Sequence, residues 1–414
     1  MWVTVFFMHI NVSPDYIGSP SWIVVDSTTG TMTSKKSMEV DETVNTWILS
    51  PTTTSGEHDF LQFARMCGRQ LTFPRQQYVQ LMDQLNVESS SMITPPWWKI
   101  MPRQAYRDDL HELARDVVGL CEPTDMDYYL NVFEPTRAIV GDLVGCHIDG
   151  DTYATFVAEA GTDTSTAVLS TFSHDEGGMC HPTRYDVVGS RTGRMTVLDG
   201  PNILTLKKEY RKMITSRWCG GRVVMLDYSS LEARVLAYEA GLNLPEDIYR
   251  HISDEILGGV SRDVAKISVI STLYGGGVSR LTQYVDADTA HHMVDSVRRL
   301  FKVDELTLRL REQLKQLGFI RNFYGRRIQT PTSDHVLVNS YAQSTGVDVA
   351  MLGFKVVCDR LKHMKSLPMF VLADALIIDI HPDEVDTIDE LCEVCSQIRG
   401  YEHKFFVKPS SILT

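Results

Sequence analysis

The sequence predicts an α+β protein made of two parts. In the first part, short apolar strands such as SWIVVD and TWILS alternate with polar loops. The segment 103–121 in the same part has the periodicity of an amphipathic helix. From 181 onward, helical segments alternate with strongly apolar strands. The passage 161–179 is rich in turn residues, so we place the boundary near 150–180.

The composition is that of an ordinary soluble globular chain. Of its 414 residues, 43% are hydrophobic and 22% are charged. No apolar run reaches the roughly 18 residues that span a membrane, and no basic residue precedes the apolar start, unlike in a signal peptide. Eight cysteines are scattered through the chain, which favours reduced thiols and a cytoplasmic setting. Cys392 and Cys395 form one C-x-x-C in an expected helix, without a second pair at zinc spacing.

Charge is unevenly distributed along the chain. Residues 1–180 hold 10 Lys and Arg against 24 Asp and Glu, whereas 181–414 hold 30 against 29. Within the second part, 191–222 hold eight basic residues against two acidic ones. Such a strip can bind phosphates even though the whole chain carries a net charge of −13. A solvated charged face is an equally simple interpretation of the charges alone.

Two acids stand at apolar strands. VVMLD ends in Asp227 and is followed by SLEARVLAYEAG, a helix that stops at Gly241. MFVLADALIIDI (369–380) is predicted as one buried strand that carries Asp374 in its middle. A single acid at a strand end often only caps the next helix. Two on separate apolar strands are better explained by a divalent metal site.

A helix between the two acids carries a stripe of four side chains. Arg262, Lys266, Ile270 and Tyr274 are spaced four apart, which places them on one slanted face about 18 Å long. Two cations followed by an aromatic ring suit a nucleoside triphosphate. The glycines at 275–277 then end the helix. An amphipathic helix with solvated bases and a core tyrosine is the alternative.

Together these segments resemble the family A DNA polymerases, the group of DNA polymerase I. DYSSLEARVLA is similar to the first palm motif, D-Y-S-x-x-E-x-R, and RDVAKISVISTLYG is similar to the fingers motif, R-x3-K-x7-Y-G. VLADALIIDI stands where the family has its second palm acid. RTGRMTVLDGPNIL and GRRIQTPTSDHVLVNSYAQSTGVDVA are similar to two further segments, so the resemblance covers 181–385 in order.

The resemblance implies a right-hand polymerase with an antiparallel palm sheet and helical fingers, and two-metal nucleotidyl transfer from a dNTP to a primer 3′-hydroxyl in DNA replication. Two Mg²⁺ ions would be bound by Asp227 and Asp374 with the carbonyl of Tyr228. The implied dNTP-binding residues are Arg262, Lys266, Ile270, Tyr274, Glu232 and Ser229, with Lys266 also an acid for the leaving group. The implied primer–template residues are Arg194, Asn202, Lys207, Lys208, Arg211, Gly275, Asn339 and Gln343, together with Lys212. Glu232 would exclude a ribose 2′-hydroxyl.

The sequence departs from the family pattern at several positions. The His and Glu that usually flank the second acid are Ala373 and Ala375, which predicts weaker primer positioning and metal binding. Ile270 replaces an aromatic residue, and Tyr249 stands where the family often has His. GCHIDGDTYATFVAEAG (145–161) resembles the family's entry to the polymerase domain.

These departures suggest a compact, phage or viral type of enzyme. We expect an N-terminal α/β domain at 1–150, a shortened thumb or connection at 151–190, and palm and fingers at 191–414, with fingers at about 242–320. About 30 residues between Gly161 and Arg191 are too few for the usual thumb. The N-terminal domain lacks a D-x-E pair after its WIVVD strand, so it is either a degenerate exonuclease or an unrelated module. A protein partner is expected to supply the clamp.

Two alternatives remain open. The alanines beside Asp374 motivate a non-catalytic DNA-binding replication subunit, whereas the intact stripe on 262–274 argues against it. A single-subunit RNA polymerase has a similar fingers helix, and Glu232 speaks against that alternative.

Overall fold

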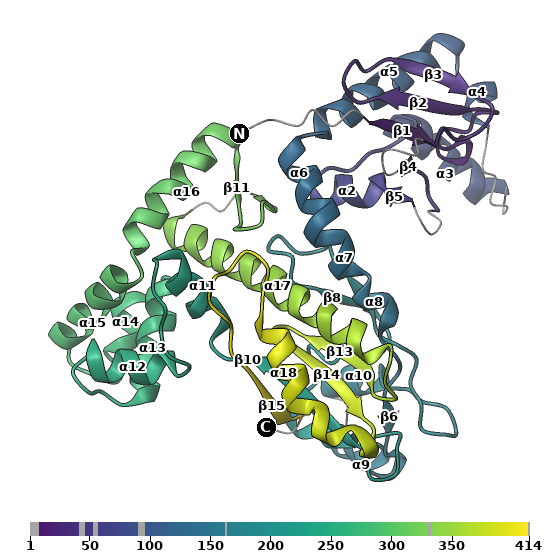
Figure 1. Ribbon diagram of the computed structural model, residues 1–414. Coiled ribbons are helices and arrows are strands. Elements are labelled where there is room, and N and C mark those ends of the chain that lie inside the picture. Colours follow the sequence, from purple (N-terminus) through teal and green to yellow (C-terminus); the bar gives the residue numbers. More distant parts are fainter. Residues whose placement is uncertain are drawn as a thin grey trace. The chain divides into compact units, whose positions relative to one another are not determined.

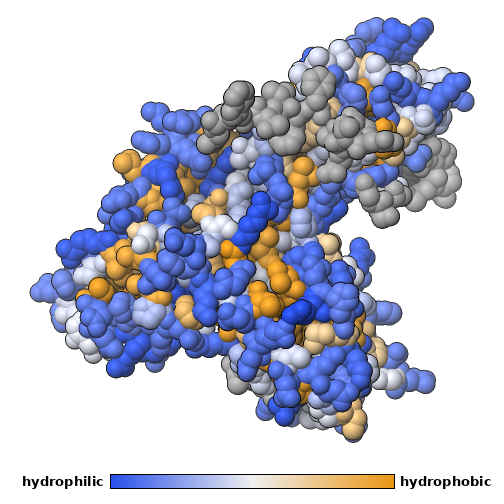
Figure 2. Space-filling view, viewed as in Figure 1, coloured by the Kyte–Doolittle hydropathy of each residue, from blue (hydrophilic) through white to orange (hydrophobic). Residues whose placement is uncertain are grey.

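A computed structural model describes residues 8–40, 46–52, 57–89, 96–161, 164–329 and 333–412. The chain forms two compact units, Met1–Tyr129 and Leu130–Thr414. The division falls earlier than the boundary expected near 150–180. The reason is that Ile139 and Leu143 pack into the core of the second unit. No helix in the described ranges is long and apolar enough to cross a membrane. The face in Figure 2 is mostly hydrophilic and is interrupted by apolar patches.

The first unit is a mixed sheet with helices. Its strand order is β3-β2-β1-β4-β5, with β1 antiparallel to β2 and parallel to β4. The strands are β1 (His9–Val12), β2 (Trp22–Asp26), β3 (Met32–Lys35), β4 (Trp47–Leu49) and β5 (His58–Asp59). The helices are α1 (Pro14–Ile17), α2 (Phe60–Met66), α3 (Gln76–Ser89), α4 (Trp97–Ile100), α5 (Arg103–Leu120) and α6 (Pro123–Tyr128), followed by the π-helix η1 (Tyr129–Phe133). The predicted strands and the amphipathic helix at 103–121 are therefore confirmed. Trp47 lies at the centre of the core, against Phe60, Phe63 and Tyr129.

The second unit is built on a four-stranded antiparallel sheet in the order β13-β14-β10-β15. These strands are β13 (Leu367–Leu372), β14 (Ala375–Ile380), β10 (Arg222–Tyr228) and β15 (Val407–Ser411). One face packs on α17 (Asp334–Leu361) and α18 (Ile388–Ser396) through Val224, Leu226 and Tyr228 of β10. Val223 and Met225 face a smaller core on the other side. This alternation, which has the period of a strand, puts Asp227 on the same face as Val223 and Met225.

Short elements precede β10 in the second unit, and those at 147–170 and 208–215 pack into the smaller core. The short elements are α7 (Glu134–Arg137), α8 (Ile139–Asp142), β6 (His147–Ile148), α9 (Gly150–Ala160), α10 (Thr164–Ser170), β7 (Arg184–Asp186), β8 (Thr196–Asp199), the 3₁₀ helix η2 (Lys208–Met213) and β9 (Ile214–Thr215). Between 150 and 190, the described residues form only two helices, α9 and α10. The 3₁₀ helix η3 (Pro382–Thr387) connects β14 to α18.

A group of helices lies beside the sheet, near one end of α17 (Figure 1). They are α11 (Leu231–Glu239), α12 (Ile248–Glu255), α13 (Arg262–Leu273), α14 (Gly277–Leu281), α15 (Ala287–Leu300) and α16 (Val303–Leu317), and the hairpin β11 (Phe319–Arg321) and β12 (Arg327–Gln329) follows. The predicted helix after Asp227 is confirmed as α11, and Gly241 beyond it has a φ of +77°. Because α11 follows β10 directly, it joins this helical group to the sheet.

Candidate active site

Asp227 and Asp374 lie side by side on the four-stranded sheet. Asp227 is the penultimate residue of β10 and pairs in register with Ala375 of β14. The backbone N–H of Tyr228 donates to the carbonyl oxygen of Asp374 at 3.2 Å. Two acids that are 147 positions apart in the sequence are therefore held together by a sheet ladder.

The prediction that a single strand runs through Asp374 is wrong. β13 and β14 are two strands that pair Leu372 with Ala375, so Ala373 and Asp374 form a two-residue hairpin turn. Ala373 has a φ of +55°, a conformation that the first turn residue of a type II′ hairpin requires and that glycine usually supplies. The apolar run concealed the turn because both strands are buried and Ala373, the first turn residue, is not a typical turn former. As a result, Asp374 lies in the turn at one end of β13 and β14 rather than within a strand.

Burial and mutual repulsion disfavour the charged form of this pair. Burial raises the pKa of Asp227 to about 6, with the negative charge of Asp374 contributing. Burial also raises the pKa of Asp374. In the described ranges, neither carboxylate forms an ion pair with a basic side chain. A cation bound between them would remove this repulsion.

The donor set fits a small oxygen-binding divalent cation. Mg²⁺ is typically bound by one or two carboxylates, with water and substrate phosphates completing its coordination. The side chain of Tyr228 is buried, and its hydroxyl donates to the carbonyl oxygen of Cys395 at 2.6 Å, so only its backbone can serve such a site. No cluster of three or more His, Cys, Asp or Glu side chains suited to a metal occurs in the described part of the chain. Cys392 and Cys395 lie in α18 and are packed in the core.

The predicted helical stripe is confirmed as α13. Ser261 caps its start, accepting from the N–H of Val264 at 3.3 Å, and the helix ends at Leu273. Arg262 and Lys266 are exposed, whereas Ile270 and Tyr274 are half-buried. Gly275 follows with a φ of +77°, a conformation that a side chain rarely adopts.

A cavity of about 240 Å³ joins α13 to the second acid. Its lining comes from α11, α12, α13 and the β13–β14 turn, and consists of Arg194, Ser230, Leu231, Glu232, Ala233, Tyr249, Val269, Ile270, Leu273, Tyr274 and Asp374. Arg194 donates to Glu232 across this space at 2.7 Å. Burial raises the pKa of Glu232, and the charge of Arg194 opposes that shift. Four predicted dNTP or template residues therefore share a cavity with a predicted metal ligand.

Other predicted site residues lie outside this cavity. Ser229 is held by its backbone N–H, which donates to the carbonyl oxygen of Phe406 at 2.8 Å. Asn202 lines a separate hollow of about 430 Å³, and its side-chain oxygen is buried without a partner in the described structure, as is that of Asn339 on α17. Gln343 lies one turn further along α17. The basic group at η2 is exposed except for Arg211, which is half-buried, and consists of Lys207, Lys208, Arg211 and Lys212.

The sequence reasoning assigned no site role to three residues near the start of α13. Tyr249, noted there only as a departure from the family pattern, has Arg262 and Lys266 over its ring, at 5.7 and 5.9 Å from its centre. Arg262 also forms an ion pair with Asp247. Arg234, the last residue of the D-Y-S-x-x-E-x-R match, is fully buried and donates to backbone carbonyls of the loop before Asp247. The position of Arg234 in that motif was the one feature of the sequence that could have singled it out.

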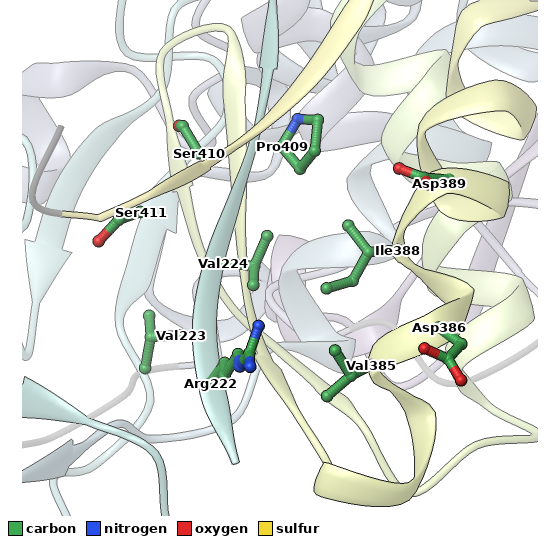
Figure 3. Close-up of a pocket in the computed structure, with 10 residues that line it drawn as sticks. All are labelled: Arg222, Val223, Val224, Val385, Asp386, Ile388, Asp389, Pro409, Ser410 and Ser411. Atoms are coloured by element: carbon green, nitrogen blue, oxygen red, sulfur yellow. The ribbon is translucent and has the colours of Figure 1, made fainter. Parts of the chain in front are cut away.

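Another hollow is remote from the acids. It measures about 690 Å³ and lies at the opposite end of β10, between that strand, β15 and α18 (Figure 3). Its lining includes Arg222, Asp386 and Asp389 and none of the predicted site residues.

Comparison with known proteins decides the family. The model of DNA polymerase family A matches residues 158–404, more than half of the chain. The chain belongs to DNA polymerase family A. The thermostable DNA polymerase I of Thermus thermophilus is 24% identical over 246 residues, which cover 51% of this chain and 29% of that protein. The DNA polymerase of Bacillus phage SP01 is 21% identical over 279 residues, which cover 56% and 30% of the two chains. This family member thus spans under a third of these relatives' length.

A solved structure extends the similarity of fold to nearly the whole chain. The POL domain of Pol1 from M. smegmatis, in a complex with DNA primer-template and dNTP, matches with a TM-score of 0.60 at 14% sequence identity. The match covers 99% of this chain and 96% of that one. It supports a mixed helix-and-sheet polymerase fold for this family A member.

Proposed function

We propose that this chain is a template-directed DNA polymerase that transfers a nucleotide from a dNTP to a primer 3′-hydroxyl during DNA replication. The observation that carries the proposal is the adjacency of Asp227 and Asp374 next to a cavity lined by α13. The four-stranded sheet corresponds to the palm, and helices α12 to α16 correspond to the fingers. Helices α9 and α10 correspond to a reduced thumb.

Two Mg²⁺ ions bound by Asp227, Asp374 and the carbonyl of Tyr228 would supply charge stabilisation for the phosphates and the attacking oxygen. In the reaction, the primer 3′-oxygen forms a bond to the α-phosphorus and loses its proton to solvent. The bond from the α-phosphorus to the bridging oxygen breaks, and pyrophosphate leaves.

The side chains of α13 would bind the triphosphate. Arg262 and Lys266 are exposed cations on one face of the helix, about 6 Å apart along its axis by the helical rise. Both would bind phosphate oxygens, and Lys266 would protonate the departing pyrophosphate. Tyr274 and Ile270, which line the cavity with Glu232, would enclose the sugar. Glu232 would then exclude a 2′-hydroxyl, because a half-buried carboxylate already paired with Arg194 leaves little room there. Ser229 would approach the triphosphate through its side-chain hydroxyl, because its backbone N–H donates to the carbonyl oxygen of Phe406.

The primer–template duplex would contact three sets of residues. Arg194, Gly275, Asn339 and Gln343 would lie near the base pair being formed, whereas Asn202 would lie along the primer. Lys207, Lys208, Arg211 and Lys212 would bind backbone phosphates, giving a salt-dependent affinity.

A partner protein would supply the clamp that a short thumb cannot. The only helices in the described part of 150–190 are α9 and α10, so little of this chain can surround a duplex. The N-terminal unit remains either a degenerate exonuclease or an unrelated module.

Primer extension by the purified chain tests the proposal. The reaction contains Mg²⁺ and dNTPs, with Asp374→Ala and a mixture of rNTPs as controls. Extension that the substitution abolishes supports a DNA polymerase. Binding of DNA without extension, with or without proteins co-purified from the source cells, would favour the accessory subunit. Efficient rNTP incorporation would favour an RNA polymerase.

A further inference from the structure

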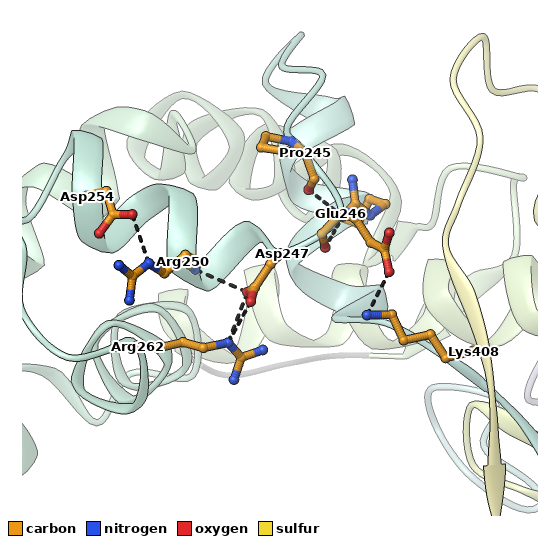
Figure 4. Close-up of polar contacts among 8 residues, drawn as sticks. Pro245, Glu246, Asp247, Arg250, Asp254, Arg262 and Lys408 are labelled. Atoms are coloured by element: carbon orange, nitrogen blue, oxygen red, sulfur yellow. Dashed lines mark hydrogen bonds and ion pairs between the residues drawn. The ribbon is translucent and has the colours of Figure 1, made fainter.

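Arg262 is held by one edge of its guanidinium. Its Nε donates to both carboxylate oxygens of Asp247, at 2.8 and 3.1 Å. Figure 4 shows the two terminal nitrogens pointing away from Asp247. No other hydrogen bond to this guanidinium occurs in the described structure. The ion pair with Asp247 therefore leaves the two terminal nitrogens of Arg262 available to bind a planar or tetrahedral anion.

Asp247 is itself fixed at the start of α12. It is the N-cap residue of that helix, and its Oδ1 accepts from the N–H of Arg250 at 3.1 Å. The hydrogen bond from Arg262 holds the pKa of Asp247 below its ordinary value, so the carboxylate is charged at neutral pH. One carboxylate therefore caps α12 and orients the first residue of α13.

The loop before Asp247 is held by contacts with α11 and with β15. The buried guanidinium of Arg234 donates to the carbonyl oxygens of Leu244, Pro245 and Glu246, at 2.9, 2.9 and 3.0 Å. The carboxylate of Glu246 pairs with Lys408 of β15 at 2.6 Å (Figure 4). The position of Asp247 is thus set by α11 and β15, the elements that flank Asp227.

We propose that Asp247 is a positioning residue that orients Arg262 for the triphosphate before the nucleotide arrives. The inference rests on the proposed function, in which Arg262 binds phosphate. A free arginine loses considerable rotamer freedom when it binds a ligand, and an arginine that is already ordered avoids that cost. The contact through Nε orders the side chain without occupying its terminal nitrogens. Asp247 therefore acts on nucleotide affinity and does not touch the reacting atoms.

The opposite role makes a distinct prediction. If Asp247 competed with the phosphates for Arg262, or repelled them, its removal would tighten nucleotide binding. The two roles differ in the sign of the change in KM.

Asp247→Ser separates the two functions of this carboxylate. Serine is also a preferred N-cap residue, so α12 keeps its cap, whereas the short hydroxyl does not replace the carboxylate at Arg262. Asp254→Ser is the matched control, since it removes another exposed carboxylate of α12 that pairs with an arginine, Arg250, at 2.9 Å. Steady-state incorporation of one dATP on a primer–template gives KM and kcat for the wild type, both variants, Arg262→Ala and the double variant Asp247→Ser/Arg262→Ala.

We expect Asp247→Ser to raise the KM for dATP about tenfold with kcat within about twofold, and Asp254→Ser to change neither. The double variant should have the KM of Arg262→Ala, because Asp247 acts only through that arginine. An unchanged or lower KM, or effects that multiply in the double variant, would overturn the inference.

The outcome is separable from that of the proposed function. If the wild type extends no primer, the proposed activity fails, and equilibrium binding of Mg²⁺–dATP to the same variants then tests the positioning role. If the wild type extends primers and Asp247→Ser behaves like the control, the positioning role alone fails. If the wild type neither extends primers nor binds dATP, both fail.

Discussion

The backbone N–H of Tyr228 donates to the carbonyl oxygen of Asp374, so the residue that follows the first acid is bonded to the second acid itself. The bond belongs to the antiparallel pair β10–β14 and fixes how closely the two carboxylates approach. Because the spacing is set by the backbone, side-chain substitutions at either acid should alter chemistry while leaving the sheet intact.

Asp374→Asn should reduce nucleotide incorporation by on the order of 10³. The amide removes one of two anionic ligands, and it also removes the repulsion that disfavours ionised Asp227. The melting temperature without metal should therefore be unchanged or higher. Single-nucleotide incorporation and thermal melting check this, with Asp386→Asn, in the remote hollow, as control. Activity close to that of the wild type would remove Asp374 from the site.

The contribution of Asp227 to stability without metal should fall as pH rises from about 4 to about 6. The pKa of Asp227 is about 6 in the folded chain against an ordinary value of 3.8, so in this window this carboxyl binds more protons in the folded state than in the unfolded state. Its contribution to the unfolding free energy then decreases with pH, and Asp227→Asn should remove that contribution from the profile. Denaturant unfolding at several pH values measures the difference between the two proteins. An identical profile for the variant would contradict the shift.

Added Mg²⁺ should reverse this trend. The cation binds the ionised carboxylates and competes with protons, so it should raise the melting temperature more at pH 7.5 than at pH 5.5. Asp227→Asn should lose most of this increase. A Mg²⁺ effect that is equal at the two pH values, or retained in the variant, would place the cation elsewhere.

Glu232→Ala should weaken discrimination against ribonucleotides about tenfold or more. The carboxylate lines the cavity with Tyr274 and is held by Arg194, so its removal opens space beside the sugar. The ratio of kcat/KM for dATP to that for ATP measures the effect. Arg194→Ala serves as the control for loss of the ion pair alone. A ratio that does not change in Glu232→Ala would exclude this residue as the sugar selector.

Gly353→Ala should destabilise the second unit by about 1–3 kcal/mol. An added Cβ would lie 2.0 Å from the hydroxyl oxygen of Tyr228 and 2.8 Å from the carbonyl oxygen of Cys395, so α17 must move away from β10. Gly141→Ala is the matched control, because its Cβ would meet nothing within 4 Å in the described structure. Urea unfolding measures both. Equal stability of the two variants would show that this packing is looser than the geometry indicates.

Local sequence signals account for most of the secondary structure and for the identity of the reactive groups. Apolar periodicity and end signals are local, so β10, α11, α13 and the helix at 103–121 were predictable from their own residues. Motif spacing likewise singled out Asp227, Asp374 and the cations of α13.

How these groups come together depends on contacts between segments that are distant in the sequence. The turn at Ala373 and Asp374 is hidden in an apolar run, because two buried strands of a hairpin read like one. The ion pair of Asp247 with Arg262 and the three carbonyls bound by Arg234 are likewise invisible in sequence. A hydrogen bond between distant segments depends on where the backbone folds back, and residue type alone does not encode that position. The sequence thus supplied the two carboxylates, and the pairing of β10 with β14 made them one site.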